Sequence, residues 1–300
     1  MPQKKSTQIF KTDLVSVGLG QGQKEISPYL YSHTEYDIEG KVVMQSTFHS
    51  SGLISEKNVT EYDNAGRVIR EIYYAEEEEP SEIVTYEYNG SGKITGSKKI
   101  YGDGSEDTTS YVYDEDNLLI ERITKDEEGD VETRETFTYS GAKPVTYEVT
   151  DDEGTRLLYE EFEYDEKGHT ILHVRDSEET GEYFKLQTEY NDAGQKIKEM
   201  IFDIDGRLVE STFFEMDEAG HTVHLVVESG PHRRERKFNF DNRGNDLGYE
   251  EINAQGDNTT KVEHQYDMEN NPVATTVFIN SGRHSMSQHY ALDYKYEWYK

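Results

Sequence analysis

A short turn motif recurs at nearly constant spacing along this chain of 300 residues. It consists of an aromatic residue, then Asp or Asn, two further residues and a Gly. The clearest copies are Tyr36-Asp37 to Gly40, Tyr62-Asp63 to Gly66, Tyr88-Asn89 to Gly92, Tyr164-Asp165 to Gly168, Tyr190-Asn191 to Gly194 and Phe240-Asp241 to Gly244. A fixed period of about 26 residues is the signature of a repeat array. In such arrays, function usually resides on an extended surface rather than in one catalytic pocket.

Weaker copies of the motif fill the gaps between the clear ones. They begin at Tyr113, Tyr139, Met216 and Tyr266, and Asn117 and Asn270 replace the glycine in two of them. With these included, the motif occurs about ten times between residues 36 and 266, in steps of 24 to 26 residues. The whole of this region is therefore expected to be one elongated repeat unit.

Each period predicts two strands and two turns. Residues 40–48 form one predicted strand, 49–52 a turn, 53–62 the returning strand and 63–66 the motif turn. Asp or Asn at the start of the motif turn can accept hydrogen bonds from backbone amides ahead of it. The closing Gly supplies the positive φ that follows a type I turn in a hairpin. The pattern predicts roughly twenty antiparallel strands in up-and-down order.

The returning strands alternate between large aromatic and acidic residues. Tyr86 and Tyr88 share one side of the predicted strand, and Glu87 between them points to the other, because strand side chains alternate. One face should carry an aromatic ladder, and the other is a candidate acidic binding face. Its members are Glu35, Glu61, Glu87, Glu163, Glu189 and Glu215.

Composition favours a thin sheet over a thick core. Only 33% of residues are hydrophobic and the mean hydropathy is -0.92, but 23 Tyr, 11 Phe and the regular turns argue against disorder. We predict an all-β array of about ten antiparallel hairpin repeats, forming a curved or superhelical single-layer sheet or a partial shell. Residues 1–30 are expected to be a leader or cap, and residues 31–300 the repeat domain with a C-terminal capping strand.

The formal net charge of -31 restricts the classes of partner. Nucleic-acid binding requires a basic surface, and anionic membranes repel an acidic one. A basic protein is the favoured partner, with faster encounter as the main gain. The alternative is that the charge simply keeps exposed sheet soluble.

Targeting signals are not recognisable in the sequence. The chain has no cysteine, its first 30 residues contain no apolar run typical of a signal peptide, and no stretch of about 18 apolar residues occurs. Membrane insertion is not expected. These features favour a cytoplasmic location, or a secreted one if a leader has been removed.

Motifs of known chemistry are missing. No Gly-x-Ser-x-Gly elbow, Walker loop or dinucleotide fingerprint occurs, and Gly18-Leu-Gly20-Gln-Gly22 is not followed by Lys-Ser/Thr. Asp203-Ile-Asp205-Gly206 is only a fragment of a calcium loop. Pairs such as His169/His173 and His221/His224 are interpreted as ordinary strand residues. We therefore expect no enzyme activity, cofactor or metal.

One basic cluster stands out in this acidic chain. Residues 232–237 read His-Arg-Arg-Glu-Arg-Lys. The simplest interpretation is a solvated turn and strand start. The alternatives are a local docking point or an internal strip of salt bridges.

The repeated motif resembles that of the YD-repeat, or Rhs-type, family. Tyr62-Asp63 to Gly66, followed by Arg67-Val68-Ile69, is similar to the family pattern almost letter for letter, and the likeness covers about residues 30–296. The resemblance implies β-hairpin arrays, which in large toxins and cell-surface relatives form shells or adhesive surfaces. The chain differs from the large toxins in its slightly longer period and in lacking a recognisable autoproteolysis segment or a following toxin domain.

These observations lead to two functional hypotheses. The first is a non-enzymatic protein-binding repeat protein, such as an intracellular neutraliser, chaperone or immunity-type partner of a basic toxin or effector. The second is a structural or scaffold subunit of a bacterial secretion, surface or shell assembly, which would self-associate through edge strands at 30–60 and 285–300. An enzyme using carboxylates from adjacent strands is a weaker third.

Overall fold

The computed structural model describes residues 3–16, 23–76, 79–280 and 287–300. In these ranges it consists of β-strands and the turns that connect them. The predicted all-β class is confirmed. The strands are Lys4–Ser16 (β1), Gln23–Glu25 (β2), Tyr29–Tyr36 (β3), Val42–Phe48 (β4), Ile54–Tyr62 (β5), Val68–Tyr74 (β6), Glu82–Tyr88 (β7), Ile94–Tyr101 (β8), Glu106–Tyr113 (β9), Leu119–Lys125 (β10), Val131–Ser140 (β11), Lys143–Thr150 (β12), Arg156–Tyr164 (β13), Thr170–Ser177 (β14), Glu182–Tyr190 (β15), Lys196–Phe202 (β16), Leu208–Met216 (β17), Thr222–Ser229 (β18), His232–Phe240 (β19), Asp246–Asn253 (β20), Asn258–Tyr266 (β21), Pro272–Ile279 (β22) and Gln288–Trp298 (β23). No helix that could cross a membrane is found in the described ranges.

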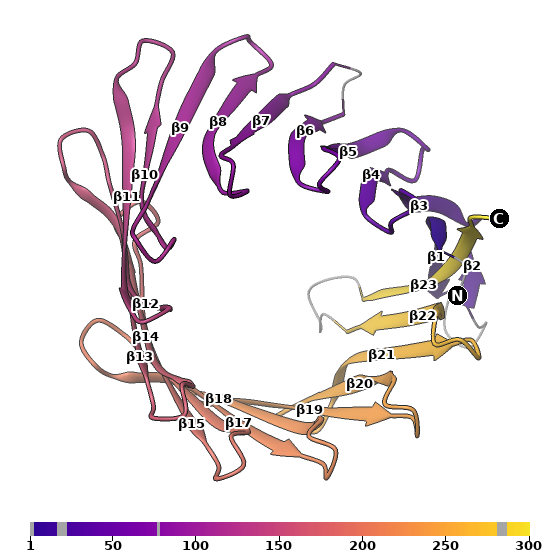
Figure 1. Cartoon of the computed structure of the whole chain (residues 1–300). Coiled ribbons are helices and arrows are strands. Elements are labelled where there is room, and N and C mark those ends of the chain that lie inside the picture. Colours follow the sequence, from indigo (N-terminus) through magenta and orange to yellow (C-terminus); the bar gives the residue numbers. More distant parts are fainter. Residues whose placement is uncertain (1–2, 17–22, 77–78, 281–286) are drawn as a thin grey trace.

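The strands form a closed ring rather than an open sheet. From β3 to β23, each strand pairs antiparallel with the next one in the sequence. β1 then pairs with both β3 and β23, so that 22 strands close into a barrel and the short β2 adds to β1 alone. Figure 1 shows the first and last strands side by side, where the ring meets itself. The prediction of an open curved or superhelical array, or a partial shell, is therefore wrong.

The closure lies in the segment that carries no motif. Ile9 in the middle of β1 lies opposite Tyr294 of β23 on one side and Ser32 of β3 on the other. This strand belongs to residues 1–30, which the sequence suggested as a leader or cap. The sequence analysis expected free edges at 30–60 and 285–300. β1 pairs with the outer side of both terminal strands, so that β3 lies between β1 and β4 and β23 lies between β22 and β1. The glycine-rich stretch from Gly18 to Gly22 lies outside the described residues.

The motif turns have the geometry that their sequence predicts. In the first copy, the Asp37 amide donates to the Lys41 carbonyl at 2.9 Å, and the Asp37 side-chain Oδ1 accepts from the Glu39 and Lys41 amides at 2.8 and 2.9 Å. Gly40 closes the turn with φ +88°. Asn117 and Asn270, which replace the glycine in two weak copies, have φ 63° and 65°. Asn tolerates this left-handed conformation better than most residues, which explains the exchange.

The motif tyrosines tie neighbouring repeats together. The hydroxyl of Tyr62 donates to the backbone carbonyl of Val42, 20 residues earlier and one strand away. Five other hydroxyls make the same kind of bond to a backbone carbonyl at the start of the preceding strand. They are those of Tyr88 to Val68, Tyr139 to Leu119, Tyr164 to Pro144, Tyr190 to Thr170 and Tyr296 to Pro272.

In several repeats, a cationic or histidine side chain that comes just after the turn glycine stacks on the aromatic ring of the next repeat. Lys41 lies over the Tyr62 ring with its Nζ 5.2 Å from the ring centroid, and His169 stacks on Tyr190 at 4.7 Å. The same contact is made by Arg67 on Tyr88, Lys93 on Tyr113, Lys143 on Tyr164 and His221 on Phe240. At the closure, Lys4 of β1 lies 4.6 Å from the Tyr296 centroid and continues the series across the junction.

The sheet encloses no dry core in the described part of the chain. Its accessible surface is 19079 Å², whereas a compact monomer of 34.7 kDa exposes about 13,000 Å². Ile72, Val227 and Val277 are the buried hydrophobic residues, and no large side chain is fully buried among the residues described. Both faces of the single layer are therefore in contact with water. Two kinds of contact must therefore supply much of the stability of the sheet: hydrogen bonds between strands, and stacked pairs of side chains.

Deleting residues 1–16 is expected to open the ring. Without β1, the strands β3 and β23 would present unpaired backbone groups, which recruit other strands. The truncated chain should form dimers or larger species in size-exclusion chromatography with light scattering, at concentrations where the full chain does not. A truncated chain that keeps its strand content by circular dichroism and the association state of the full chain would contradict the closure.

Removing one tyrosine hydroxyl should cost measurable stability. Tyr139→Phe deletes the 2.7 Å bond to the Leu119 carbonyl and should lower the free energy of unfolding by about 1 kcal/mol in urea titrations. Tyr266→Phe is the matched control, because the Tyr266 hydroxyl makes no hydrogen bond to another described residue. Equal losses in the two variants would show that the hydroxyl bonds do not join the repeats.

Candidate functional site

The predicted acidic face is partly neutralised by its own neighbours. All six glutamates lie on alternate strands, on the face opposite the motif aromatics. Glu61 pairs with Arg70 at 3.4 Å, and Glu215 pairs with His224 at 3.2 Å. Glu35 lies 3.8 Å from His33 and Glu189 lies 3.8 Å from Lys198. Glu87 and Glu163 form no ion pair with any residue that the structure describes.

These six carboxylates are not brought together. Each is separated from the next by at least one intervening strand, which places neighbouring members at least about 10 Å apart around the ring. β9 and β11 carry Val112 and Thr138 at the equivalent position, so the series is also interrupted. At such spacing, salt screens most of their mutual repulsion. The face is mildly acidic but has no concentrated site.

A denser acidic region lies at the opposite end of the strands from the motif turns. The turn between β8 and β9 and the turn between β10 and β11 flank a groove of about 500 Å³, which we call the acidic groove. Seven of its nine lining residues are carboxylates. The lining consists of Tyr101, Asp103, Ser105, Glu106, Asp107, Asp126, Glu127, Glu128 and Glu132.

The acidic groove contains one carboxyl group whose pKa is raised. Loss of hydration, followed by the charges of Asp107 and Asp126, raises the pKa of Glu132 above its ordinary value. At the motif turns the shift is opposite. The side-chain amide of Asn245, which donates a hydrogen bond, lowers the pKa of Asp241 to about 2. Within the acidic groove itself, hydrogen bonds from Ser105 lower the pKa of Asp103, so the raised pKa of Glu132 is a local effect of its lost hydration and of its two carboxylate neighbours.

The basic cluster divides between the two faces of β19. Arg236 donates to Glu251 at 2.6 Å, and Arg234 lies 3.9 Å from Glu210, both on the face of the motif aromatics. Arg233 pairs with Glu228 at 3.5 Å on the other face. These arginines form salt bridges on both faces, but His232, Arg233 and Arg234 are exposed at the start of β19, in line with the simplest interpretation of the cluster.

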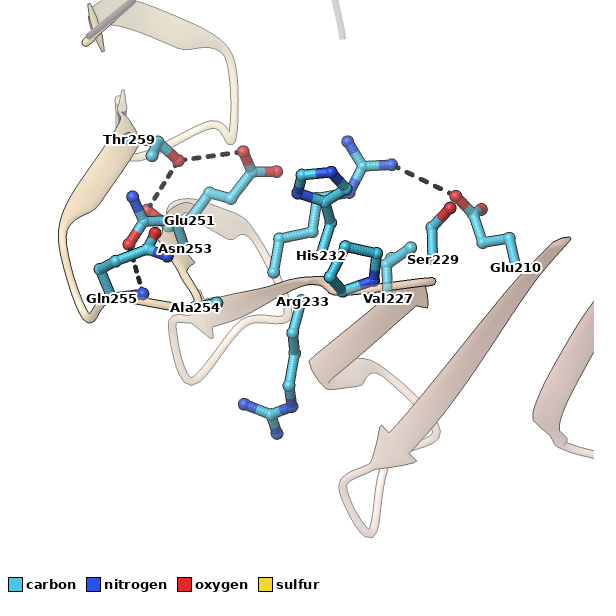
Figure 2. Close-up of a pocket in the computed structure, with 12 residues that line it drawn as sticks. Glu210, Val227, Ser229, His232, Arg233, Glu251, Asn253, Ala254, Gln255 and Thr259 are labelled. Atoms are coloured by element: carbon cyan, nitrogen blue, oxygen red, sulfur yellow. Dashed lines mark hydrogen bonds and ion pairs between the residues drawn. The ribbon is translucent and has the colours of Figure 1, made fainter. Parts of the chain in front are cut away.

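A second cavity, of about 440 Å³, is formed beside Arg234. Figure 2 shows side chains from β17 to β21 converging on it, with Arg233 directed away. The lining residues are Glu210, Val227, Ser229, Pro231, His232, Arg233, Arg234, Glu251, Asn253, Ala254, Gln255 and Thr259. The sequence marked only the basic members of this set. The others come from four further strands and two turns, which are brought together by strand register.

The cavity beside Arg234 does not contain a preorganised nucleophile. Ser229 and His232 are register partners in β18 and β19, but no hydrogen bond joins their side chains. A serine hydroxyl needs such a base within hydrogen-bonding reach to be activated. A serine and a histidine occur together in acyl-transfer enzymes, but Ser229 and His232 are not joined as such a pair. The cavity therefore has the character of a binding pocket.

The histidine pairs singled out in the sequence have carboxylate and aromatic partners. His169 lies 2.8 Å from Asp165 and His221 lies 2.9 Å from Asp217, in each case within a motif turn. His173 stacks on Phe162 at 4.5 Å. Within the described ranges, no group of three or more His, Asp or Glu residues is arranged to hold a metal ion.

Comparison with known proteins identifies no family. No family model matches the chain, and no curated protein matches it. Among solved structures, it is similar to the TcdB2–TccC3–Cdc42 complex, with 10% identity and a TM-score of 0.45 over 91% of this chain, and it spans 17% of the matched chain. It is also similar to porin-like proteins of Bacteroides uniformis (10% identity, TM-score 0.33, 99% of this chain and 100% of that one) and Bacteroides vulgatus (12%, 0.24, 99% of each). Likenesses of this strength carry no argument about function.

Replacing Glu132 tests the negative field of the acidic groove. A carboxyl group whose pKa is raised in the folded protein opposes folding when ionised, and this penalty disappears below its ordinary pKa of 4.5. Glu132→Gln should therefore raise the melting temperature at pH 7 and leave it unchanged at pH 3. Glu166→Gln, in an exposed turn elsewhere, controls for net charge. An equal effect of both variants at pH 7 would argue against a local field.

Proposed function

We propose that this chain is a non-enzymatic protein-binding protein whose partner is basic. The observation that carries the proposal is the acidic groove, where seven carboxylates gather and the pKa of Glu132 is raised. Bringing lysine or arginine side chains into such a field relieves the repulsion between the carboxylates, and that relief contributes to binding. The net charge of -31 would also accelerate encounter with a basic protein.

The acidic groove is better suited to this role than the glutamates on the strands. Lys98 pairs with Glu106 at 2.5 Å, but the lining of the groove itself contains no lysine or arginine. Glu127 and Glu128 are exposed at the turn. A basic loop or extended segment could therefore reach several carboxylates at once without displacing existing cations. On the strands, by contrast, four of the six predicted glutamates already have cationic or histidine partners.

The concrete form of the proposal is an intracellular neutraliser, chaperone or immunity-type partner of a basic toxin or effector. The resemblance of the motif to YD repeats supports an association with toxins, and the repeated hairpins and turns are consistent with that resemblance. A cytoplasmic location is part of the proposal, as is the lack of a cofactor. Nucleic acids would be repelled by the charge.

The alternative of a scaffold or shell subunit has less support. It depended on free edge strands at 30–60 and 285–300. β1 pairs with β3 and with β23, so these edges are not available for association. No other feature of the described residues favours assembly over binding.

Affinity capture from cells of the source organism tests the proposal. The wild-type chain should retain a basic protein at about 50 mM salt and release it at about 500 mM, because salt screens exposed charges. A variant with Glu127→Gln, Glu128→Gln and Glu132→Gln should retain much less of that protein. A matched variant with Glu61→Gln, Glu87→Gln and Glu163→Gln loses the same charge elsewhere and should retain it.

Three outcomes would count against the proposal. They are retention of acidic partners only, capture that does not depend on salt, and equal losses in the two triple variants. The last outcome would mean that overall charge, and not the acidic groove, determines binding.

A further inference from the structure

We propose that the cavity beside Arg234 binds the oxyanion group of a small organic molecule, with the Arg234 guanidinium as its main ligand. This site is separate from the acidic groove and does not depend on the proposed protein partner. This cavity of about 440 Å³ is lined by an arginine and a histidine together. Pockets of this size commonly hold small molecules.

Arg234 retains unused hydrogen-bonding capacity. Its side chain is 52% exposed, and its ion pair with Glu210 is long, at 3.9 Å. Arg236, two residues on, is fully engaged by comparison. It donates to Glu251 at 2.6 Å and stacks on the Tyr249 ring at 5.4 Å. A guanidinium carries five N–H donors in a planar fork that fits a carboxylate or phosphate with two parallel bonds.

The two carboxylates of the cavity leave room for an anion. Glu251 is occupied, because it accepts from Arg236 and from the Thr259 hydroxyl at 3.1 Å. Glu210 approaches Arg234 from β17, on one side only. The net charge of -31 is spread over the whole ring, and at physiological ionic strength charges more than about 8 Å away are largely screened.

The remaining lining suits the organic part of a small molecule. Val227 forms an apolar surface in the cavity and is 8% exposed. Pro231 and Ala254 add apolar surface from the two adjoining turns. Ser229 and Gln255 offer hydroxyl and amide groups for further polar contacts. The lining thus combines a cation with an apolar surface, as expected for a small acid rather than for a bare ion.

The adjacent arginine provides a matched control. Arg233 and Arg234 are neighbours in β19, and Figure 2 shows the Arg233 side chain pointing away from the other lining residues. Its partners are Glu228 and Glu235, on the opposite face. Replacing either arginine by glutamine changes the net charge equally, but only Arg234→Gln removes the proposed ligand.

Isothermal titration calorimetry with inorganic phosphate, acetate and isobutyrate tests the site. The wild-type chain should bind at least one of these probes, and Arg234→Gln should weaken that binding at least about tenfold, as expected for the loss of a charge-assisted hydrogen bond. Arg233→Gln should change it less than twofold. Tighter binding of isobutyrate than acetate would indicate a carboxylate ligand that uses the Val227 surface. Preference for phosphate would indicate a phosphorylated one.

Glu210→Gln separates an oxyanion site from a site for cations or zwitterions. Removing the competing carboxylate should strengthen binding of the probes. Weaker binding in this variant would overturn the proposal, as would equal losses in Arg233→Gln and Arg234→Gln, or no binding of any probe by the wild type at 20-fold molar excess and millimolar concentration. Circular dichroism and melting temperatures show whether each variant is folded. The triple glutamine variant of the acidic groove should bind the probes normally.

Discussion

The closed shape of this structure depends on the backbone hydrogen bonds that join β1 to β3 and to β23. A single-layer sheet of this length has no dry core to hold it in one shape, and its accessible surface is 19079 Å². An open sheet would leave two long rows of unpaired amides and carbonyls in water. Closure satisfies both rows at once and removes the edges. The ring therefore gives a very acidic, weakly hydrophobic chain a defined structure.

Local contacts repeat around the ring and make each hairpin dependent on the one before it. The turn aspartates cap their own backbone, and six tyrosine hydroxyls donate to the preceding strand. In several repeats, a side chain just after the turn glycine covers the next aromatic ring. None of these contacts is strong alone, since a neutral hydrogen bond contributes only about 1 kcal/mol. Their repetition gives a structure whose stability is approximately a sum of neighbour terms.

The sequence was sufficient to predict the hairpins because turn chemistry is local. Asp63 and Gly66 define a turn whatever lies elsewhere, and the alternation of Tyr86, Glu87 and Tyr88 defines two faces. Closure could not be predicted in this way. β1 contains no motif. Its residue Ile9 pairs with Tyr294, which lies near the other end of the sequence. The period of the repeat gives the order of the strands but not the curvature of the sheet.

Each candidate site likewise has a part that the sequence could show and a part that required the fold. The basic residues at 232–237 were visible in the sequence, but the cavity beside Arg234 also requires Glu210, Val227 and Thr259, whose positions follow from register. The acidic groove was missed because its carboxylates lie in the turns that vary most in sequence. Asp103 and Glu128 occupy equivalent places one period apart, but only the structure shows that their turns flank a common groove. Charge alone indicated a basic partner, whereas the location of a site needed the fold.

Closure by β1 can be tested most directly with a cysteine pair, because the chain has no cysteine of its own. Thr12 and Ala291 are register partners in β1 and β23. In a Thr12→Cys, Ala291→Cys variant, oxidation or a short bismaleimide should link the two positions within one monomer and in high yield. The pair Thr12→Cys and Thr146→Cys, with the second position on a distant strand, should remain unlinked. No link in the first pair, or links only between molecules, would contradict a closed ring.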